Sequence, residues 1–252
     1  MYTLVMNDYT GEKRIGMKLA AALLWLAVWQ IASMALGKSF VLPSPVSTFK
    51  RLLELCAQGS FWQACGVTLL RVAAGLLLAC LLGFVCAWAA QKSRAVKEIL
   101  AVPAAVIRSV PVMSVILIAL LAMKSAVVPL FVCFLMCFPV MYTNILQGFE
   151  SMPDEYRELA QVYRIEGSRY FTKIMIPASM GYIKAGLSLC AGLSWKSTVA
   201  AEVLSSPRIS MGYHLMTAKM YLEGADLFAW TVGIVLLSVC FEKAIRRLLR
   251  RW

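Results

Sequence analysis

The chain has 252 residues, of which 61% are hydrophobic and 15% are charged, and its formal net charge is +12. A soluble domain of this size could not bury so much apolar surface, so the composition excludes a soluble globular protein. It indicates one integral membrane domain with no room for a second, globular one.

Long stretches without charged residues predict the membrane spans. The clearest are residues 19–37, 72–91 and 125–149, which approach or exceed the ~20 residues that a helix needs to cross a bilayer. Helices are favoured because open strands leave unpaired backbone groups in lipid. We therefore expect an all-α integral membrane fold with six transmembrane helices, near residues 16–37, 67–91, 104–123, 126–148, 178–199 and 226–245.

The distribution of basic residues predicts the topology. If the N-terminus is cytoplasmic, most of the 25 Lys and Arg residues fall in cytoplasmic segments, as the positive-inside rule requires. Both termini are then cytoplasmic: residues 1–15 form the N-terminal segment, 16–248 the transmembrane domain and 249–252 the tail. The positive charge is a topology signal, so the expected surroundings are a lipid bilayer and not nucleic acid. A cleaved signal peptide is the alternative for the first span, but its apolar run is longer than that of a typical signal.

Short polar segments separate the expected spans. Residues 46–58 have the periodicity of an amphipathic helix on the outer surface, and a plain connector is the alternative. Residues 92–103 are expected to form a short basic hairpin, and the third span begins with a proline break at Ile107–Pro111. Further along, residues 205–212 suggest an outer turn and residues 213–222 a short outer helix.

Nothing in the sequence indicates a catalytic or metal site. The eight cysteines contain no Cys-x-x-Cys pair, and small apolar packing is their simplest role. His214, which is the single histidine, lies in an outer segment without an evident partner, so an intramembrane enzyme is not favoured.

The most informative segment is a charged island at residues 150–177. Ser151 is expected to cap a helix with Pro153 and Asp154 in its first turn. Tyr156, Leu159, Ala160 and Tyr163 recur at helical spacing and should share one face. Residues 166–168 should turn the chain into a second short helix that Pro177 ends. On physical grounds alone, an amphipathic loop at the lipid headgroups is an open alternative.

At this point the sequence resembles the inner-membrane permeases of ABC importers. Their last long cytoplasmic loop carries Glu-Ala-Ala, a glycine four residues later, and Ile-x-Leu-Pro after nine more residues. This chain has Glu158-Leu159-Ala160 and Ile174-Met175-Ile176-Pro177 at the same spacing, with Arg164 where the glycine is expected and a glycine at Gly167. Residues 42–45, the Arg71 segment, 108–111 and 195–202 look like the nitrate, sulfonate and taurine branch, which includes thiamine-precursor permeases. The likeness extends from about residue 15 to 248.

The resemblance implies a type I ABC importer permease in the inner or plasma membrane of a prokaryote. Residues 150–177 would contain the coupling helix that docks on a separate ATPase subunit, with Tyr156, Leu159, Ala160 and Tyr163 seated and Glu158 and Arg164 fixing the orientation. The chain lacks a Gly-x-x-x-x-Gly-Lys-Ser/Thr loop, so ATP and Mg would be bound by that partner and no cofactor by this chain. The other implied partners are a second permease copy, identical in this branch, and an extracytoplasmic solute-binding protein.

Ionisable residues at membrane depth are the candidates for the translocation pathway. They are Arg108, Lys184 and Lys196, with Ser109, Asn144 and Trp195 among their polar or aromatic neighbours. Three cations suit a small anionic or polar solute. Alternatively, Arg108 and Lys184 reach the cytoplasmic interface, and Lys196 pairs with Glu202. A stand-alone channel or secondary transporter is the competing function, although no repeat of broken helices supports it.

Overall fold

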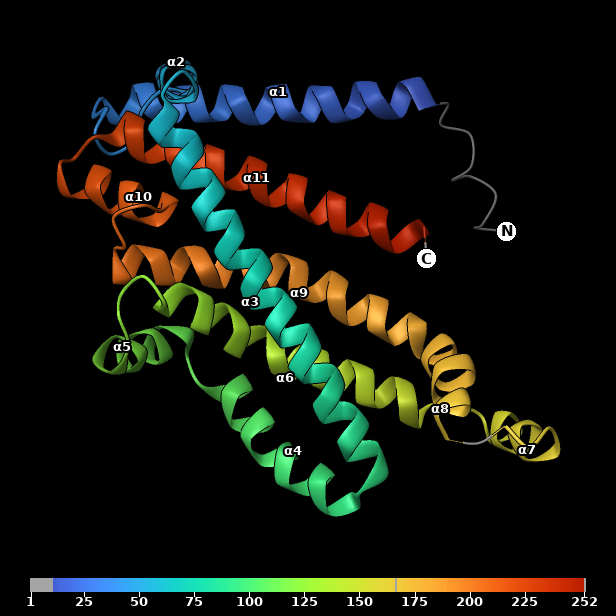
Figure 1. Cartoon of the computed structure of the whole chain (residues 1–252). Coiled ribbons are helices and arrows are strands. Elements are labelled where there is room, and N and C mark those ends of the chain that lie inside the picture. Colours follow the sequence, from blue (N-terminus) through green and yellow to red (C-terminus); the bar gives the residue numbers. More distant parts are fainter. Residues whose placement is uncertain (1–10, 166, 252) are drawn as a thin grey trace.

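The computed structural model describes residues 11–165 and 167–251, and this part of the chain folds into helices without a strand (Figure 1). The all-α prediction is therefore confirmed. The elements in chain order are α1 (Gly11–Leu36), α2 (Pro45–Cys56), α3 (Gly59–Lys92), α4 (Arg94–Ser109), α5 (Val112–Ala122), α6 (Val128–Glu150), α7 (Asp154–Val162), α8 (Gly167–Tyr170), a π-helical turn (Phe171–Met175), α9 (Ile176–Ser205), α10 (Met211–Met220) and α11 (Gly224–Arg251).

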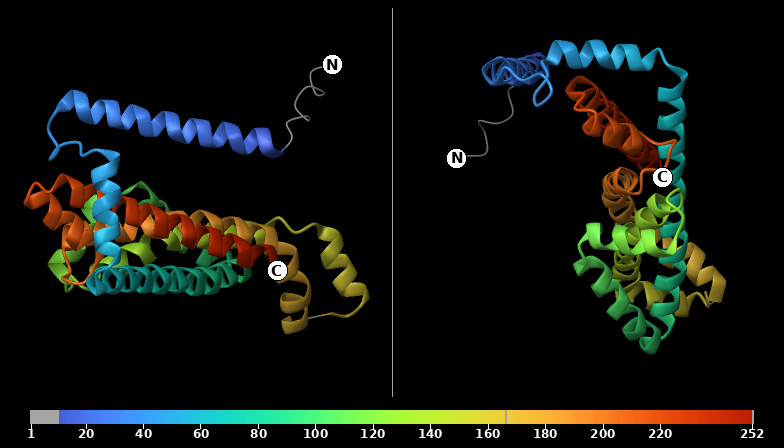
Figure 2. Two further views of the ribbon diagram at one scale, coloured as in Figure 1. Left: turned by 90° about the horizontal axis from the view of Figure 1, so that it is seen from above. Right: turned by 90° about the vertical axis from the view of Figure 1, so that its left-hand side faces the viewer.

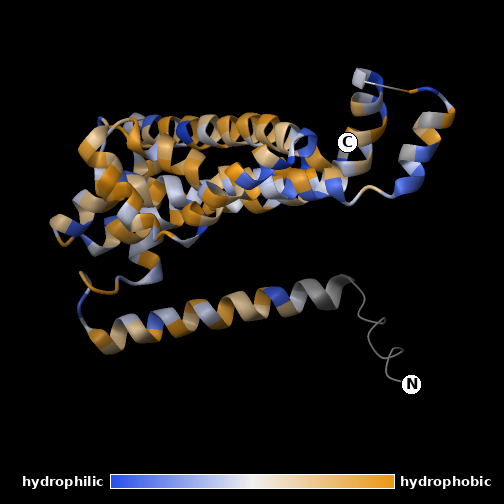
Figure 3. Cartoon of the chain, turned by 90° about the horizontal axis from the view of Figure 1, so that it is seen from below, coloured by the Kyte–Doolittle hydropathy of each residue, from blue (hydrophilic) through white to orange (hydrophobic). Residues whose placement is uncertain are grey.

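Five helices of the described chain are long and apolar enough to cross a membrane. They lie at Gly16–Leu36, Gly59–Lys92, Val128–Glu150, Gly167–Ser205 and Gly224–Arg250. Apolar residues cover the sides of these long helices, as Figure 3 shows. The helix pair α4 and α5 supplies a sixth candidate, so the expectation of six spans agrees with the structure.

The third span differs from the prediction because it is not one continuous helix. α4 and α5 meet at an angle of 106° instead of forming a straight span over residues 104–123. A proline disfavours the helical conformation of the residue before it, and Val110 is accordingly extended, with ψ of 131°. The expected break at Pro111 is real, and it separates α4 and α5, which run in very different directions.

The predicted hairpin at residues 92–103 is wrong. α3 ends at Lys92 and α4 begins at Arg94, so Ser93 alone reverses the chain, with an extended φ of −138°. Pro103 lies inside α4 and does not end it. The basic residues that suggested a loop therefore lie on helices.

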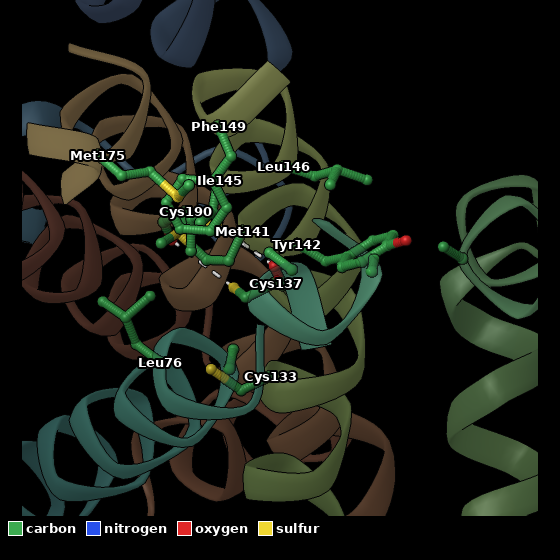
Figure 4. Close-up of a cluster of buried hydrophobic side chains, with 14 of the residues drawn as sticks. Leu76, Cys133, Cys137, Met141, Tyr142, Ile145, Leu146, Phe149, Met175 and Cys190 are labelled. Carbon is green, nitrogen blue, oxygen red and sulfur yellow. Dashed lines mark hydrogen bonds between the residues drawn. The ribbon is translucent and has the colours of Figure 1, made fainter. Parts of the chain in front are cut away.

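The core is built around α6, which packs against α3 on one side and α9 on the other. Small residues permit the close approach, because an added Cβ at Gly75 would lie 2.7 Å from Cys133. Cys137 and Cys190 are buried where α6 meets α9, and each thiol points to the other residue's carbonyl oxygen at 3.8 and 3.5 Å (Figure 4). These cysteines are packing residues, as expected.

The elements separate into two ends along the long helices. The start of α1, the end of α11 and the α7–α8 segment lie at one end, whereas α2, α5 and α10 lie at the other (Figures 1 and 2). This arrangement is consistent with the predicted topology, in which the chain termini share a side with the charged island.

α1 stands apart from the other helices. None of its span is buried, and α2 bridges the gap between α1 and α3 (Figure 2). The contacts that hold α1 lie near its last turns: the Trp29 ring is 5.8 Å from that of Phe228, and its Nε1 donates to the Pro43 carbonyl at 3.0 Å. A long apolar surface on α1 therefore lacks protein cover.

Candidate functional site

The charged island forms a helix that projects beyond one end of the bundle (Figure 1). α7 begins at Asp154, where the Tyr156 N–H donates to the Pro153 carbonyl at 3.1 Å. The prediction that Ser151 caps this helix is wrong. Ser151 ends α6 instead, with its N–H bonded to Gln147 and its hydroxyl to the Gly148 carbonyl at 3.3 Å.

The side chains of α7 that were expected on one face are not equally open. Tyr156, Leu159 and Tyr163 are 45%, 52% and 68% exposed, and Tyr163 lies just beyond the last helical residue. Ala160 is only 4% exposed, so the chain itself covers it. The open apolar surface thus consists of the two tyrosines, the leucine and Val162, which is 78% exposed, and Glu158 is exposed beside it.

Arg164 occupies a left-handed turn at the end of α7. Its φ is +52°, and the Ile165 N–H behind it donates to the Ala160 carbonyl at 2.7 Å. A bond from an N–H to the carbonyl five residues earlier, with a left-handed residue directly before that N–H, is the Schellman arrangement that ends many helices. Glycine is favoured there because it has no Cβ, which explains why the motif has glycine at this position. Arg164 keeps the same backbone despite the change.

Gly167 makes a second left-handed turn, with φ of +59°. Helix then continues from Gly167 to Ser205 through α8, the π-helical turn and α9. The prediction that Pro177 ends a helix is wrong, because Pro177 lies in the first turn of α9. The π-helical turn directly before it, in which the Ile176 N–H bonds to the Phe171 carbonyl, accommodates the proline.

An aromatic cluster joins this segment to the bundle. The Phe171 ring lies 5.8–5.9 Å from those of Phe84, Trp88 and Phe149, which come from α3 and α6. The Lys92 ammonium lies 3.8 Å above the Trp88 ring. Aromatic contacts of this kind are each worth about 1 kcal/mol beyond buried area, so α8 and the π-helical turn are fixed to α3 and α6.

The pathway candidates are not brought together. Arg108 and Ser109 are exposed at the end of α4 and bond to carbonyls of their own helix, Ala104 at 3.2 Å and Val106 at 2.9 Å. Asn144 is half-buried in α6 and donates to the Val140 carbonyl at 2.8 Å.

Trp195 and Lys196 line a cavity of about 580 Å³ between α5, α9, α10 and α11. Apolar side chains, among them Met113, Leu215 and Ile234, form most of its wall. Lys196 is exposed, whereas Trp195 is buried with its indole Nε1 lacking a hydrogen-bond partner in the described structure. This cavity therefore offers one cation in apolar surroundings, and the buried indole N–H of Trp195 in its wall is an unused donor.

Glu202 does not pair with Lys196, contrary to the alternative that the sequence left open. It is fully buried, and its carboxylate accepts from Arg71 at 2.7 Å, from the Thr68 hydroxyl at 2.9–3.0 Å and from the Gly212 N–H at 3.2 Å. We call these four residues the Glu202 network. The sequence did not reveal it because Arg71 and Glu202 are 131 residues apart; two opposite charges within apolar runs were the available signal.

The end of the bundle that carries α2 and α10 has its own polar contacts. Arg51 of α2 bonds to Asp226 at the start of α11 and to Glu54 at 3.0 Å, and the bond to Asp226 is the main cause that raises the pKa of Arg51. The His214 ring stacks on Trp230 at 4.5 Å, and burial lowers the pKa of this imidazole while Asp226 opposes the shift. His214 is thus part of the packing of α10 on α11. Within the described residues, no group of three His, Cys, Asp or Glu side chains could hold a metal.

Comparison with known proteins shows which family the chain resembles. The family described as "Binding-protein-dependent transport system inner membrane component" matches residues 79–252. The bicarbonate transport system permease protein CmpB of Synechococcus elongatus is 28% identical over 93% of this chain and 87% of its own length. The nitrate import permease protein NrtB of the same organism is 29% identical over 86% and 82%. The putative aliphatic sulfonates transport permease protein SsuC of Bacillus subtilis is 27% identical over 96% and 90%.

Proposed function

Because the chain belongs to the family of binding-protein-dependent transport system inner membrane components, and is thus a multi-pass permease subunit of a bacterial ABC importer, we propose that residues 150–177 dock on a separate ATPase subunit. The observation that carries the proposal is α7 itself. It projects from the bundle and exposes Tyr156, Leu159 and Tyr163, which are large apolar side chains in a polar segment. Exposed aromatic and aliphatic side chains of this kind are typical anchors of protein interfaces.

The docked segment would drive alternating access through α9. α7 leads through Gly167 and the π-helical turn into the continuous helix that ends at Ser205. Movement of the ATPase subunits on binding and hydrolysing ATP would therefore reach the far end of the bundle along one element. ATP and Mg belong to the ATPase subunits, and this chain binds no cofactor.

A second copy of this permease would complete the transmembrane unit. The uncovered apolar length of α1 supports this, because a second copy would give α1 a protein neighbour. With α7 facing the cytoplasm, as the basic residues predict, both termini are cytoplasmic. An extracytoplasmic binding protein would then meet the end that carries α2, α5 and α10.

The transported solute is a small anion in this proposal. The relatives are named for bicarbonate, nitrate and aliphatic sulfonates, which are all anions. Lys196 and Trp195 are the pathway residues that the cavity supports most directly, and Arg108, Ser109 and Asn144 are further candidates. An exposed ammonium in the cavity wall and an unpaired indole N–H are donors from which an oxyanion accepts hydrogen bonds.

Capture of the ATPase subunit tests the proposal. Leu159→Asp should fold but fail to retain the ATPase subunit on purification, because a charge replaces an exposed anchor. Leu222→Asp is the matched control, since Leu222 is also exposed but precedes α11 at the opposite end. Equal capture by both variants would contradict the docking assignment. Solute flux by the chain without any ATPase subunit would favour a stand-alone channel or secondary transporter.

A further inference from the structure

The Glu202 network connects three elements at the end of the bundle opposite α7. Thr68 and Arg71 come from α3, Glu202 from the last turn of α9, and Gly212 from the start of α10. The network also holds the turn between α9 and α10, because Arg71 donates to the Ile209 carbonyl at 3.1 Å and the Met211 N–H donates to the Thr68 hydroxyl at 3.1 Å. The carboxylate thus accepts from two helices, and two of its donors, Arg71 and Thr68, also hold the turn between α9 and α10.

The backbone of α10 packs closely against α9 beside this carboxylate. A Cβ added at Gly212 would lie 2.4 Å from the Cβ of Glu202 and 2.6 Å from the Val203 nitrogen. The first turn of α10 is therefore pressed directly on α9. Only this close approach brings the Gly212 N–H within reach of the carboxylate.

Opening the network would leave a buried carboxylate without its cation. Loss of one partner of a buried ion pair is strongly destabilising, because it leaves an uncompensated buried charge. The opposite end of α9 is different, because it begins with a π-helical turn and a proline, which are sites where helices bend.

We propose that Glu202 is a positioning residue that keeps α3, the end of α9 and the start of α10 as one rigid body throughout the transport cycle. Movement delivered at α7 then displaces this body as a unit, instead of being lost as slippage of α9 along α3. The inference rests on the proposed function for the source of that movement.

Hydrogen exchange measured by mass spectrometry tests the rigid body. In the assembled transporter, deuterium uptake at residues 203–213 should be the same without nucleotide and with ADP and vanadate trapped after ATP hydrolysis, whereas uptake at residues 151–175 should change. Glu202→Gln should raise uptake at residues 203–213 in both states. Uptake at residues 203–213 that increases on ATP binding would overturn the proposal, because the network would then open in each cycle.

Coupling measurements separate a positioning role from simple stabilisation. Thr68→Val removes the hydroxyl at nearly constant shape, and we expect it to lower solute transported per ATP hydrolysed by roughly tenfold while ATP hydrolysis per transporter persists. Thr68→Ser keeps the hydroxyl and should restore the ratio. A loss of transport and hydrolysis in the same proportion in Thr68→Val would show a merely structural role.

These outcomes are distinct from failure of the proposed function. If no ATPase subunit is captured, the proposed function fails, and the exchange of Glu202→Gln can still be measured in the permease alone. Unchanged uptake at residues 203–213 in that variant would refute the rigid body itself.

Discussion

Replacing Arg164 with glycine should stabilise the end of α7, because Arg164 is held in a left-handed conformation with φ of +52°. A side chain with a Cβ pays about 1–2 kcal/mol for this conformation, and glycine avoids that cost. Glycine also gains freedom in the unfolded chain, which opposes the effect by about 0.4–1 kcal/mol. The net stabilisation of this turn is therefore about 0.5–1 kcal/mol.

Hydrogen exchange at the Ile165 amide reports this change directly, because that N–H donates to the Ala160 carbonyl across the turn. A gain of about 1 kcal/mol slows its local opening about fivefold. Arg164→Ala is the matched control, since alanine removes the guanidinium but keeps the Cβ, and it should leave the exchange rate close to that of the unaltered chain. Faster exchange in Arg164→Gly, or equal slowing in both variants, would refute the reasoning.

Three further changes have expected results. Gly212→Ala should destabilise the chain by about 2 kcal/mol in thermal unfolding, because the added Cβ overlaps the neighbouring helix. Gly66→Ala is the control and should show no such loss, since its added Cβ meets nothing within 4 Å. The pKa of His214 is lower in the folded chain than its unfolded value of about 6.5, so the folded chain binds fewer protons than the unfolded chain. Stability should therefore fall as the pH drops below about 6.5. His214→Phe should remove this part of the dependence of the melting temperature on pH. Lys196→Met should reduce the uptake of an anionic solute per expressed transporter severalfold. Lys219→Met should not reduce it, because Lys219 is exposed and lies outside the cavity. Equal uptake by the two variants would remove Lys196 from the pathway.

The long apolar runs were sufficient to predict where the spans lie, since lipid requires about 20 apolar helical residues whatever the tertiary packing. They did not predict helix ends. α3 begins at Gly59, several residues before the expected start, because hydropathy measures the lipid boundary while a helix continues into water as long as its backbone bonds are satisfied. The single-residue reversal at Ser93 was missed for the same reason.

The charged island could be located from its composition, and the spacing from Glu158 to Pro177 suggested a docking role. The sequence could not show that Ala160 is covered, because burial there depends on how the turn at Arg164 folds back. The effect of Pro177 was misjudged, because a proline is tolerated in the first turn of a helix. Glu202 was placed with the wrong cation, since sequence proximity favoured Lys196 and only the packing of α3 on α9 brings Arg71 to it.

The separation of α1 from the remaining helices has a consequence for the order of assembly. Transmembrane helices insert as independent units and associate afterwards. The packed centre formed by α3, α6 and α9 owes little to α1, whose span has no buried residues. α1 can therefore remain surrounded by lipid without delaying formation of the core, and the core can form before α1 meets a protein neighbour.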